Sequence, residues 1–345
     1  MTKINLIQKI FIIQNYSLLL NILINKKMPK ILIAGGTGFI GSHLTSYLTK
    51  NNHDVIVYDS NIQYFYPLTE TNIKNMEYRH KTLLKDSLKI RGSVLDPCDL
   101  RRTILEHKPD YVINLAALPL AVTAIQNSEE AFESILVGTK NFMEILRDVD
   151  FVKKYIHISS SMVYGDFVKN PNRESAPKNP KEIYGSMKLA SEFVVKGYAQ
   201  RHDINYAIIR PSAVYGPTDN NRRVLQIFVE SAIAGEKIVA KNPSSNILDF
   251  SFVEDTAKGI AQVALSESAQ GKAYNITRGE GRSLKDVITI LSQTFPNLDV
   301  DLVDEDSFYP KRGALDTTAA NADASYQPLH SLEDGLKKYI EFLRV

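Results

Sequence analysis

The sequence predicts an α/β fold in which a doubly wound parallel sheet carries a smaller, interleaved C-terminal α/β lobe. Segments typical of buried strands alternate with helical segments from residue 31 to residue 209. Such alternation favours a parallel sheet with right-handed crossovers. The first strand also breaks at a glycine-rich turn, residues 35–41, that opens a helix. Beyond Gly216 the alternation becomes irregular, which indicates a second lobe.

Composition limits the classes of function that remain. The 345 residues can bury a large core, as one large domain or as two smaller ones. The net charge of +2 gives no basic signature, so nucleic acid is not expected as a partner. The single cysteine, Cys98, excludes an internal disulfide and a cysteine-only metal site, and no metal site is expected. With no strong export signal, the reducing cytoplasm is the simplest location.

The first 27 residues need a separate interpretation. Residues 10–24 are apolar, but polar side chains interrupt them and the stretch is too short for a transmembrane helix. Lysines precede it as in a signal peptide, yet no small-residue cleavage site follows. We expect residues 1–27 to be a disordered or mis-started extension ahead of Met28. A membrane-surface helix is the alternative, although no membrane partner is expected.

The strands of the first half follow from short apolar runs. They are expected at residues 31–34, 54–58, 111–115, 155–159 and 204–209, and residues 90–96 are expected to hold the third strand with its exit loop. Helices are expected at 100–107 and 129–148. The connection 61–89 is too long for a simple turn, so it is expected to contain a helix as well.

The turn after the first strand has the spacing of a dinucleotide-binding site. Gly35, Gly38 and Gly41 stand where a strand-to-helix turn needs a tight bend, a close backbone approach and a slim helix–strand contact. The helix opens at Phe39 and Ile40, and its free N–H groups would face a dinucleotide diphosphate. A glycine turn without a ligand is the alternative.

Two further strand ends fit the same ligand. Asp59 follows the second strand, where a carboxylate accepts from the adenosine ribose hydroxyls. Its charge would repel a 2′-phosphate, so NAD is favoured over NADP; an ordinary turn residue is the alternative. Ala116 and Ala117 follow the fourth strand, and their small side chains let a ligand ring lie against the backbone. Close helix packing would explain them equally.

These patterns divide the chain into two parts. Residues 28–215 are expected to form an NAD-binding Rossmann domain, to which 249–275 partly return, and residues 216–345 a substrate-binding lobe. The lobe is expected to contain helices at 224–234, 255–265, 284–295 and 332–343, with strands at 248–253 and 273–276. A ligand between the two parts would lie over the C-terminal edge of the strands.

Polar residues after the fifth strand suggest proton transfer. Of the 17 tyrosines, only Tyr184 has a lysine, Lys188, four residues later, and this spacing puts both on one helical face. A neighbouring ammonium favours the phenolate of a tyrosine, whose free pKa is near 10. A strand-end hydroxyl such as that of Ser160 would hold the substrate oxygen. A chance tyrosine–lysine pair and a serine turn are the alternatives.

Together these motifs resemble the extended short-chain dehydrogenase/reductase superfamily, specifically its NAD-dependent epimerase/dehydratase group, which acts on nucleoside-diphosphate sugars. The resemblance covers residues 29–345. Its motifs are AGGTGFIG at 34–41, LAA at 115–117, SSSMVYG at 159–165, YGSMK at 184–188 and RPSAVYGP at 210–217.

The resemblance implies NAD as the cofactor and assigns roles to single residues. Tyr184 is then the base, Lys188 its helper and Ser160 the hydroxyl that holds the substrate. Cofactor contacts are expected at Gly35, Gly38, Phe39, Ile40, Gly41, Asp59, Ala116, Ala117, Tyr184, Lys188 and Pro211, and substrate contacts at Ser161, Arg223 and Arg312. The two arginines suit the substrate diphosphate. Helices 129–148 and 184–200 are expected to form the two-fold interface of a homodimer.

The reaction is predicted from two positions after Ser160. The 4,6-dehydratases of the family carry an Asp-Glu pair where this chain has Ser161 and Met162, because eliminating water needs an additional acid and base. The resemblance therefore predicts a nucleoside-diphosphate-sugar epimerase acting at C4, with tightly bound NAD and a transient 4-keto intermediate. An NAD(P)-dependent 4-keto-sugar reductase and a 4,6-dehydratase are alternatives. A catalytically silent NAD-binding regulator is the alternative from another class.

Overall fold

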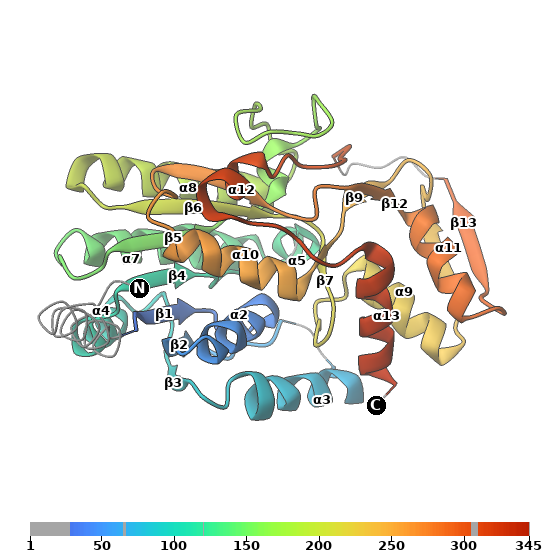
Figure 1. Cartoon of the computed structure of the whole chain (residues 1–345), viewed down its shortest axis with the longest axis horizontal. Helices are drawn as coiled ribbons and strands as arrows, with labels where there is room; N and C mark the ends of the chain where they lie inside the picture. Colours follow the sequence, from blue (N-terminus) through green and yellow to red (C-terminus); the bar gives the residue numbers. More distant parts are fainter. Residues whose placement is uncertain (1–27, 65–66, 120, 305–309, 345) are drawn as a thin grey trace, which may run out of the picture.

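The fold is a doubly wound α/β structure with a smaller lobe beside the sheet (Figure 1). The computed structural model describes residues 28–64, 67–119, 121–304 and 310–344, so the expectation for residues 1–27 lies outside the described residues. No helix in these described ranges is long and apolar enough to cross a membrane.

The central sheet confirms the predicted architecture. It has seven strands in the order β11-β6-β5-β4-β1-β2-β3, and all neighbouring pairs are parallel. The strands are β1 Lys30–Ala34, β2 Asp54–Asp59, β3 Leu88–Arg91, β4 Tyr111–Asn114, β5 Lys154–Ile158, β6 Tyr206–Pro211 and β11 Lys272–Ile276. The winding direction reverses between β1 and β4, and such a switch point opens a crevice at the carboxyl ends of the strands.

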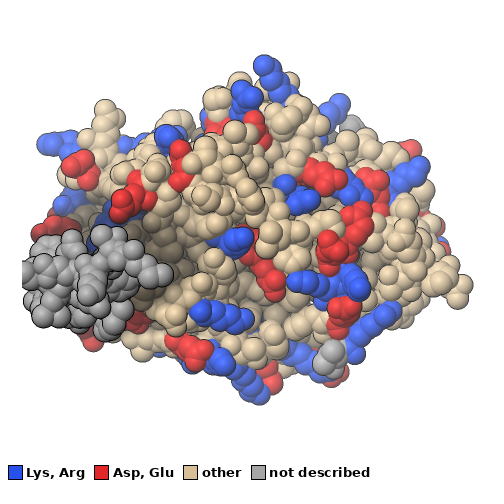
Figure 2. All heavy atoms as spheres, viewed as in Figure 1, with Lys and Arg blue, Asp and Glu red and all other residues tan. Residues whose placement is uncertain are grey.

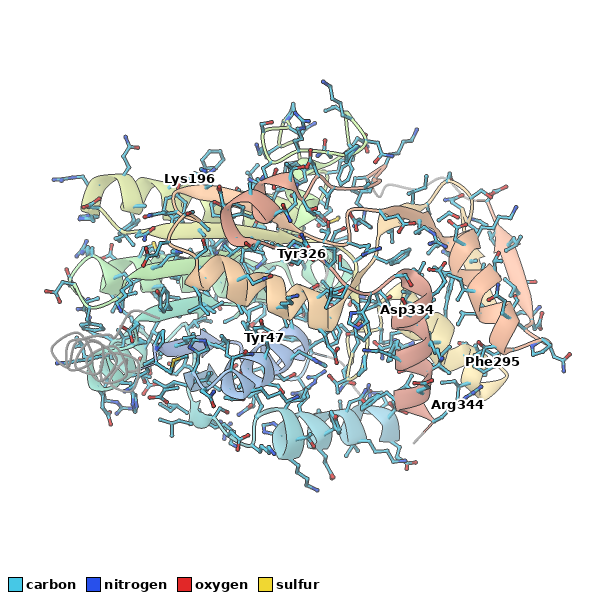
Figure 3. The ribbon with its side chains drawn as sticks, in the orientation of Figure 1. Tyr47, Lys196, Phe295, Tyr326, Asp334 and Arg344 are labelled. Carbon is cyan, nitrogen blue, oxygen red and sulfur yellow. The ribbon has the colours of Figure 1, made fainter. Side chains whose placement is uncertain are left out.

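Helices bury both faces of this sheet. On one face lie α2 Phe39–Lys50, α10 Val253–Leu265 and α12 Thr318–Ala324, and on the other α4 Pro97–His107, α7 Gly138–Leu146 and α8 Ile183–His202. Tyr47 of α2 and Tyr326 after α12, both labelled in Figure 3, pack into the core of the first face. Each face thus has its own apolar cluster, as a buried parallel sheet requires.

The C-terminal lobe has a separate core. Its helices are α9 Val224–Ala234, α11 Leu284–Thr294 and α13 Leu332–Leu343, and its strands are β7 Val214–Tyr215, β8 Ile238–Lys241, β9 Ile247–Asp249, β10 Ser251–Phe252, β12 Gly281–Ser283 and β13 Val300–Val303. The Arg344 guanidinium lies 5.0 Å from the Phe295 ring centre and ties the end of α13 to the end of α11 (Figure 3).

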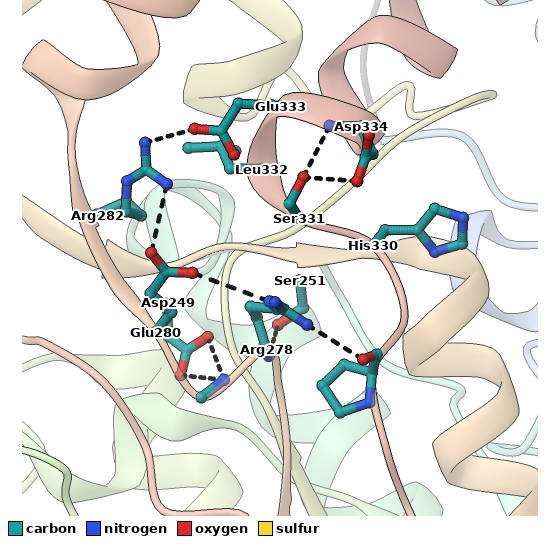
Figure 4. A network of polar contacts seen from close by, with 12 residues as sticks. Asp249, Ser251, Arg278, Glu280, Arg282, His330, Ser331, Leu332, Glu333 and Asp334 are labelled. Atoms are coloured by element: carbon teal, nitrogen blue, oxygen red, sulfur yellow. Dashed lines mark hydrogen bonds and ion pairs between the residues drawn. The ribbon is translucent and has the colours of Figure 1, made fainter.

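Polar contacts fasten the lobe internally (Figure 4). Arg282 donates to Glu333 at 2.8 Å, and Arg278 donates to the carbonyl of Pro328 at 3.1 Å. On the face that Figure 2 displays, acidic and basic side chains are interspersed rather than gathered by sign.

Two predicted elements are interrupted in the structure. The expected helix 129–148 is interrupted: α6 Ser128–Phe132 leads into a π-helical turn, η2 Glu133–Val137, before α7 begins. Inside that turn, the Ser134 hydroxyl accepts from the backbone of Leu118 at 3.0 Å and donates to the carbonyl of Glu130 at 2.7 Å.

The third strand ends at Arg91, and its exit loop follows as expected. Gly92 in this loop packs against the Tyr58 ring, where an added Cβ would lie only 2.3 Å away. The second difference also has a local cause. The expected strand 248–253 is split into β9 and β10 after Asp249. The buried Asp249 carboxylate accepts from the backbones of Leu315 and Gly279 instead of letting the strand continue.

We predict that His157 makes the free energy of unfolding depend on pH. This β5 residue is 1% exposed, and burial lowers its pKa to about 3, with the charge of Lys188 acting in the same direction. An unfolded histidine takes up a proton below about pH 6.5, whereas the folded one stays neutral. The contribution of His157 to the free energy of unfolding should therefore fall by about 1.4 kcal/mol for each unit by which the pH is lowered from roughly pH 6 to 4.

Urea denaturation of the wild type and His157→Gln at pH 7, 6, 5 and 4 measures this contribution. The variant is less stable at pH 7, because the 2.8 Å contact with the Ser191 hydroxyl is altered. Its stability should then decline less steeply with acid. Parallel curves for the two proteins would show that His157 does not carry this pH dependence.

Candidate functional site

A cavity of about 570 Å³ lies at the carboxyl ends of the strands, between the sheet and the C-terminal lobe. The glycine turn, the ends of β2, β4, β5 and β6, the start of α8 and residues 220–224 of the lobe line it. All candidate site residues from the sequence line this one cavity: Gly35, Gly38, Phe39, Ile40, Gly41, Asp59, Ala116, Ala117, Ser160, Ser161, Tyr184, Lys188, Pro211, Arg223 and Arg312. Among the described residues, no group of three or more His, Cys, Asp or Glu side chains is arranged to hold a metal ion.

The glycine turn leaves room for a ligand at the N-terminus of α2. Gly35 has a φ of +76°, and a Cβ on it would lie 2.7 Å from the Ala116 nitrogen. A Cβ on Gly41 would lie 2.3 Å from the Gly35 carbonyl. Gly38 precedes the helix, and no side chain caps the N–H groups that follow. Uncapped N–H groups and the helix dipole fit the diphosphate of a dinucleotide.

The Asp59 carboxylate lies at the end of β2, beside the same turn. It accepts from the Thr37 nitrogen at 2.9 Å and from the Asn61 nitrogen at 2.8 Å. These two bonds fix the carboxylate beside the glycine turn and leave further lone pairs for ribose hydroxyls. The arrangement fits a dinucleotide cofactor.

Ser160, Tyr184 and Lys188 come together over the end of β5. The Ser160 hydroxyl accepts from the Met162 nitrogen at 3.2 Å and so caps a short 3₁₀ turn, η3 Ser161–Tyr164. Lys188 donates to the carbonyl of Ile158 at 2.8 Å, and its Nζ lies 5.7 Å from the Tyr184 ring centre. The predicted spacing therefore puts an ammonium beside a phenol.

Burial disfavours the charged forms of both groups. It raises the pKa of Tyr184 to about 12, against a hydrogen bond with Ser160 and the charge of Arg223, which both lower it. It lowers the pKa of Lys188 to about 8, against the charge of Glu192. Near neutral pH the lysine is thus mostly protonated, and the tyrosine holds its proton until further positive charge arrives.

Sequence reasoning missed the residue that fixes the start of α8. Glu182 caps this helix: its two carboxylate oxygens accept from the Tyr184 and Gly185 nitrogens, each at 2.9 Å. The signal was present, because an acidic residue two positions before Tyr184 suits a helix N-terminus. Glu182 sets the position of the first turn, which carries Tyr184.

A buried ion pair behind the site was also missed. Arg210 at the end of β6 donates to both carboxylate oxygens of Glu192, at 2.8 and 2.6 Å. Ser159 donates to the same carboxylate at 2.6 Å, and Arg210 also donates to the Tyr164 hydroxyl at 2.9 Å. The pair joins the serine run to α8, one turn beyond Lys188.

Two arginines stand at the lobe side of the cavity. Arg223 donates to Asp219 at 3.1 Å, and its guanidinium lies 5.5 Å from the Phe39 ring centre. Arg312 is half-buried, and desolvation lowers its pKa to about 10. Its Nε is buried and has no hydrogen-bond partner within the described part of the chain. A guanidinium with such a donor fits an anionic ligand group.

Comparison with known proteins agrees with this geometry. Residues 31–277 match the family model described as the NAD dependent epimerase/dehydratase family. The UDP-glucose 4-epimerase of Mycolicibacterium smegmatis is 27% identical over 91% of this chain and 98% of its own length. The dTDP-glucose 4,6-dehydratase of Neisseria meningitidis is 25% identical over 91% of this chain and 93% of its own length.

Solved structures are similar over the same range. The UDP-glucuronic acid 4-epimerase from Bacillus cereus, in complex with UDP-glucuronic acid and NAD, has a TM-score of 0.83 and 25% identity, over 91% of this chain and 99% of that one. The UDP-glucose 4-epimerase from Thermotoga maritima, with UDP-glucose, has a TM-score of 0.80 and 25% identity, over 91% of this chain and 98% of that one. Because relatives of similar identity include both epimerases and dehydratases, the reaction has to be argued from the site.

We predict that Asp59→Ala reduces the preference for NAD over NADP. The 2′-phosphate of NADP would lie beside the wild-type carboxylate, and removing this charge removes the repulsion. The ratio of the NADP and NAD dissociation constants should fall by at least about 10-fold, or roughly 1.4 kcal/mol. Equilibrium titration of each dinucleotide measures the ratio. Asp54→Ala, at the exposed start of the same strand, should leave it unchanged; an unchanged ratio in Asp59→Ala as well would contradict the prediction.

Proposed function

Because the chain belongs to the NAD-dependent epimerase/dehydratase family, we propose that it is a nucleoside-diphosphate-sugar epimerase acting at C4. NAD is the cofactor of this family, and the glycine turn and Asp59 fit it. Similar proteins are named for, or were solved with, nucleotide sugars such as UDP-glucose and UDP-glucuronic acid. The family comparison supports the chemistry of a sugar nucleotide, and the side chains of this cavity support the choice of reaction.

The observation that carries the choice is that the described residues beside Tyr184 include no additional acid–base pair. Ser161 and Met162 follow Ser160 in the cavity wall, and neither exchanges a proton near neutral pH. Among the described lining residues, the carboxylates are Asp59, beside the glycine turn, and Glu130, which accepts from Tyr64. Elimination of water across two carbons needs an additional acid and base. Oxidation and re-reduction of one carbon needs neither.

In this proposal the chain's own groups move one proton. Tyr184 removes the proton from the sugar hydroxyl, and Ser160 holds the same oxygen by a hydrogen bond. The Lys188 ammonium, 5.7 Å from the Tyr184 ring centre and one helical turn further along α8, stabilises the phenolate. NAD, when bound, would supply the hydride acceptor and donor for the sugar carbon. After the keto-sugar has turned over, Tyr184 would return the proton to the oxygen of the inverted carbon.

The substrate diphosphate is assigned to the lobe. Arg223 and Arg312 both line the cavity, and the Nε of Arg312, which has no partner among the described residues, offers a donor for a phosphate oxygen. Guanidinium groups match phosphate geometry with paired N–H donors. The Ser161 side chain is assigned to the sugar, next to Ser160.

The reaction is tested by incubating the purified protein with UDP-glucose and UDP-glucuronic acid, without an added reductant. Chromatography and mass spectrometry then identify the product. A product of equal mass with inverted C4 supports the proposal. Loss of water identifies a dehydratase, and turnover only with added NADH or NADPH on a 4-keto-sugar identifies a reductase. A protein that binds NAD and converts none of these substrates would match the silent regulator.

Tyr184→Phe should reduce kcat by about 10²–10⁴-fold, the usual contribution of a proton-transferring group. Bound NAD should remain, because the ring that packs in the cavity wall is kept. The matched control is Tyr198→Phe on the same helix, whose hydroxyl contacts Glu144 outside the cavity. Its turnover should match the wild type. A Tyr184→Phe enzyme with full turnover would remove the assigned base.

We also propose that the protein forms a homodimer through α8 and the helices beside it. Large apolar side chains are exposed on neighbouring helices: Phe193 on α8 is 63% exposed, Ile125 on α5 Ala121–Gln126 is 52% exposed and Phe132 on α6 is 47% exposed. Contiguous exposed apolar side chains mark interaction surfaces. A two-fold axis would bring each patch onto its own copy.

Phe193→Glu should weaken this dimer. An aromatic anchor lost from both copies is expected to cost at least about 2 kcal/mol, which raises the dissociation constant roughly 30-fold. Light scattering after size-exclusion chromatography over a range of concentrations measures it. Leu329→Glu, at an equally exposed apolar site (67%) ahead of α13, is the control and should stay dimeric. A wild type that is monomeric at all concentrations would contradict the proposal.

A further inference from the structure

One segment of the lobe is fastened directly to the cofactor half of the molecule. We call residues 217–223 the substrate loop, since it ends at Arg223, which lines the cavity. Its contacts run to α2 and to the connection after β2, which contains α3 Glu70–Tyr78 and a π-helical turn, η1 Arg79–Leu83. The first residue of that turn is the main link.

Arg79 bridges the glycine turn and the substrate loop. It is 7% exposed, donates through Nη1 to the Thr37 carbonyl at 3.4 Å, and donates through Nη2 to the Thr218 carbonyl. Thr37 belongs to the turn expected to hold the cofactor diphosphate. The Arg79 side chain lines the cavity, and its Nε has no hydrogen-bond partner among the residues described. One buried guanidinium therefore contacts both halves of the site.

Neutral side chains reinforce the same junction. His43 of α2 donates from Nε2 to the Pro217 carbonyl at 3.0 Å, and burial lowers its pKa to about 4, so it is neutral near pH 7. Asn75 of α3 donates to the Asn220 side chain at 2.8 Å. These bonds hold the substrate loop. The His43 ring also packs against Phe39, but among the described contacts only Arg79 of these three side chains donates a hydrogen bond to the glycine turn.

The charges at the junction depend on one another. Asp219 is fully buried and accepts from Arg223 at 3.1 and 3.3 Å, and its charge also raises the pKa of Arg79. Burial, the larger effect, lowers the pKa of Arg79 to about 10. Arg223 stacks on Phe39, the first residue of α2. Two contacts therefore position the Arg223 side chain: the ion pair with Asp219 in the substrate loop and the stacking on Phe39 at the start of α2.

We propose that Arg79 is a positioning residue that couples cofactor binding to substrate binding. Arg79 donates to the Thr37 carbonyl and to the Thr218 carbonyl. The glycine turn and the substrate loop therefore become ordered together. NAD, which orders the turn, then also orders the loop that presents Arg223 to the substrate diphosphate. The inference rests on the proposed nucleoside-diphosphate substrate.

Linkage makes the proposal measurable from either ligand. If NAD strengthens binding of a nucleoside diphosphate by some factor, the diphosphate must strengthen NAD binding by the same factor. For wild-type protein we expect UDP to lower the NAD dissociation constant by about 10-fold, within the common range of coupling between sites. The experiment titrates NAD into the full-length protein by calorimetry, with and without saturating UDP.

Arg79→Met removes both bridging donors. The factor by which UDP lowers the NAD dissociation constant should then be close to 1, although UDP and NAD should each still bind alone. Arg79→Lys keeps the charge but cannot span both carbonyls, so its factor should fall between the two; it also tests the proposal if the methionine variant does not fold. The control is Arg278→Met, a half-buried arginine that also donates to a carbonyl, that of Pro328, and pairs with Glu280 (Figure 4). Arg278 does not line the cavity. Its coupling factor should equal that of the wild type.

The outcomes separate this inference from the proposed reaction. A folded Arg79→Met or Arg79→Lys protein with the full wild-type factor would overturn the coupling role. So would a wild type in which UDP leaves NAD affinity unchanged, or one that does not bind UDP. A wild type that shows the coupling, loses it in Arg79→Met and yet produces no epimer would retain the coupling role and contradict the 4-epimerase alone.

Discussion

The arrangement over β5 depends on the buried ion pair between Arg210 and Glu192. It joins the end of β6 to the middle of α8, and through Ser159 and Tyr164 it also holds the residues on either side of Ser160. The Tyr164 hydroxyl in turn donates to Asn275 of β11 at 2.7 Å. A buried pair of this kind is costly to leave half-made, because an unpaired charge would remain inside the core. It therefore fixes the relative position of the serine hydroxyls and the helix that carries Tyr184 and Lys188.

The glycine turn imposes the second constraint, and the two constraints meet in the cavity. Gly35 lies against the backbone of Ala116, so the first strand and the end of β4 approach more closely than side chains would allow. This approach brings the N-terminus of α2 to the edge of the same cavity as Tyr184. Arg79 and Arg223 extend the turn towards the lobe, one by hydrogen bonds and one by stacking on Phe39. The cofactor and substrate sides of the cavity thus share a wall.

Whether a feature could be predicted from the sequence depends on how far apart its interacting residues lie along the chain. The glycine turn, Asp59 and the Tyr184–Lys188 pair are encoded by spacings within one turn or one strand–helix unit, so they were visible without a structure. Arg79 was not, because its partners Thr37 and Thr218 lie 42 and 139 residues away and are backbone carbonyls, which leave no sequence signal. The π-helical turn at 133–137 was missed for a related reason: its apolar spacing resembles that of an uninterrupted helix.

The proposed base also explains why the site needs its neighbours. Burial raises the pKa of Tyr184 to about 12, which favours the neutral phenol. Arg223 opposes this effect, but a bound diphosphate would neutralise much of its charge. In the proposed reaction, the compensating positive charge would come from Lys188 and from NAD in its oxidised form. Proton removal from the sugar would then be favoured while the cofactor can still accept a hydride, so that the proton transfer and the hydride transfer would depend on each other.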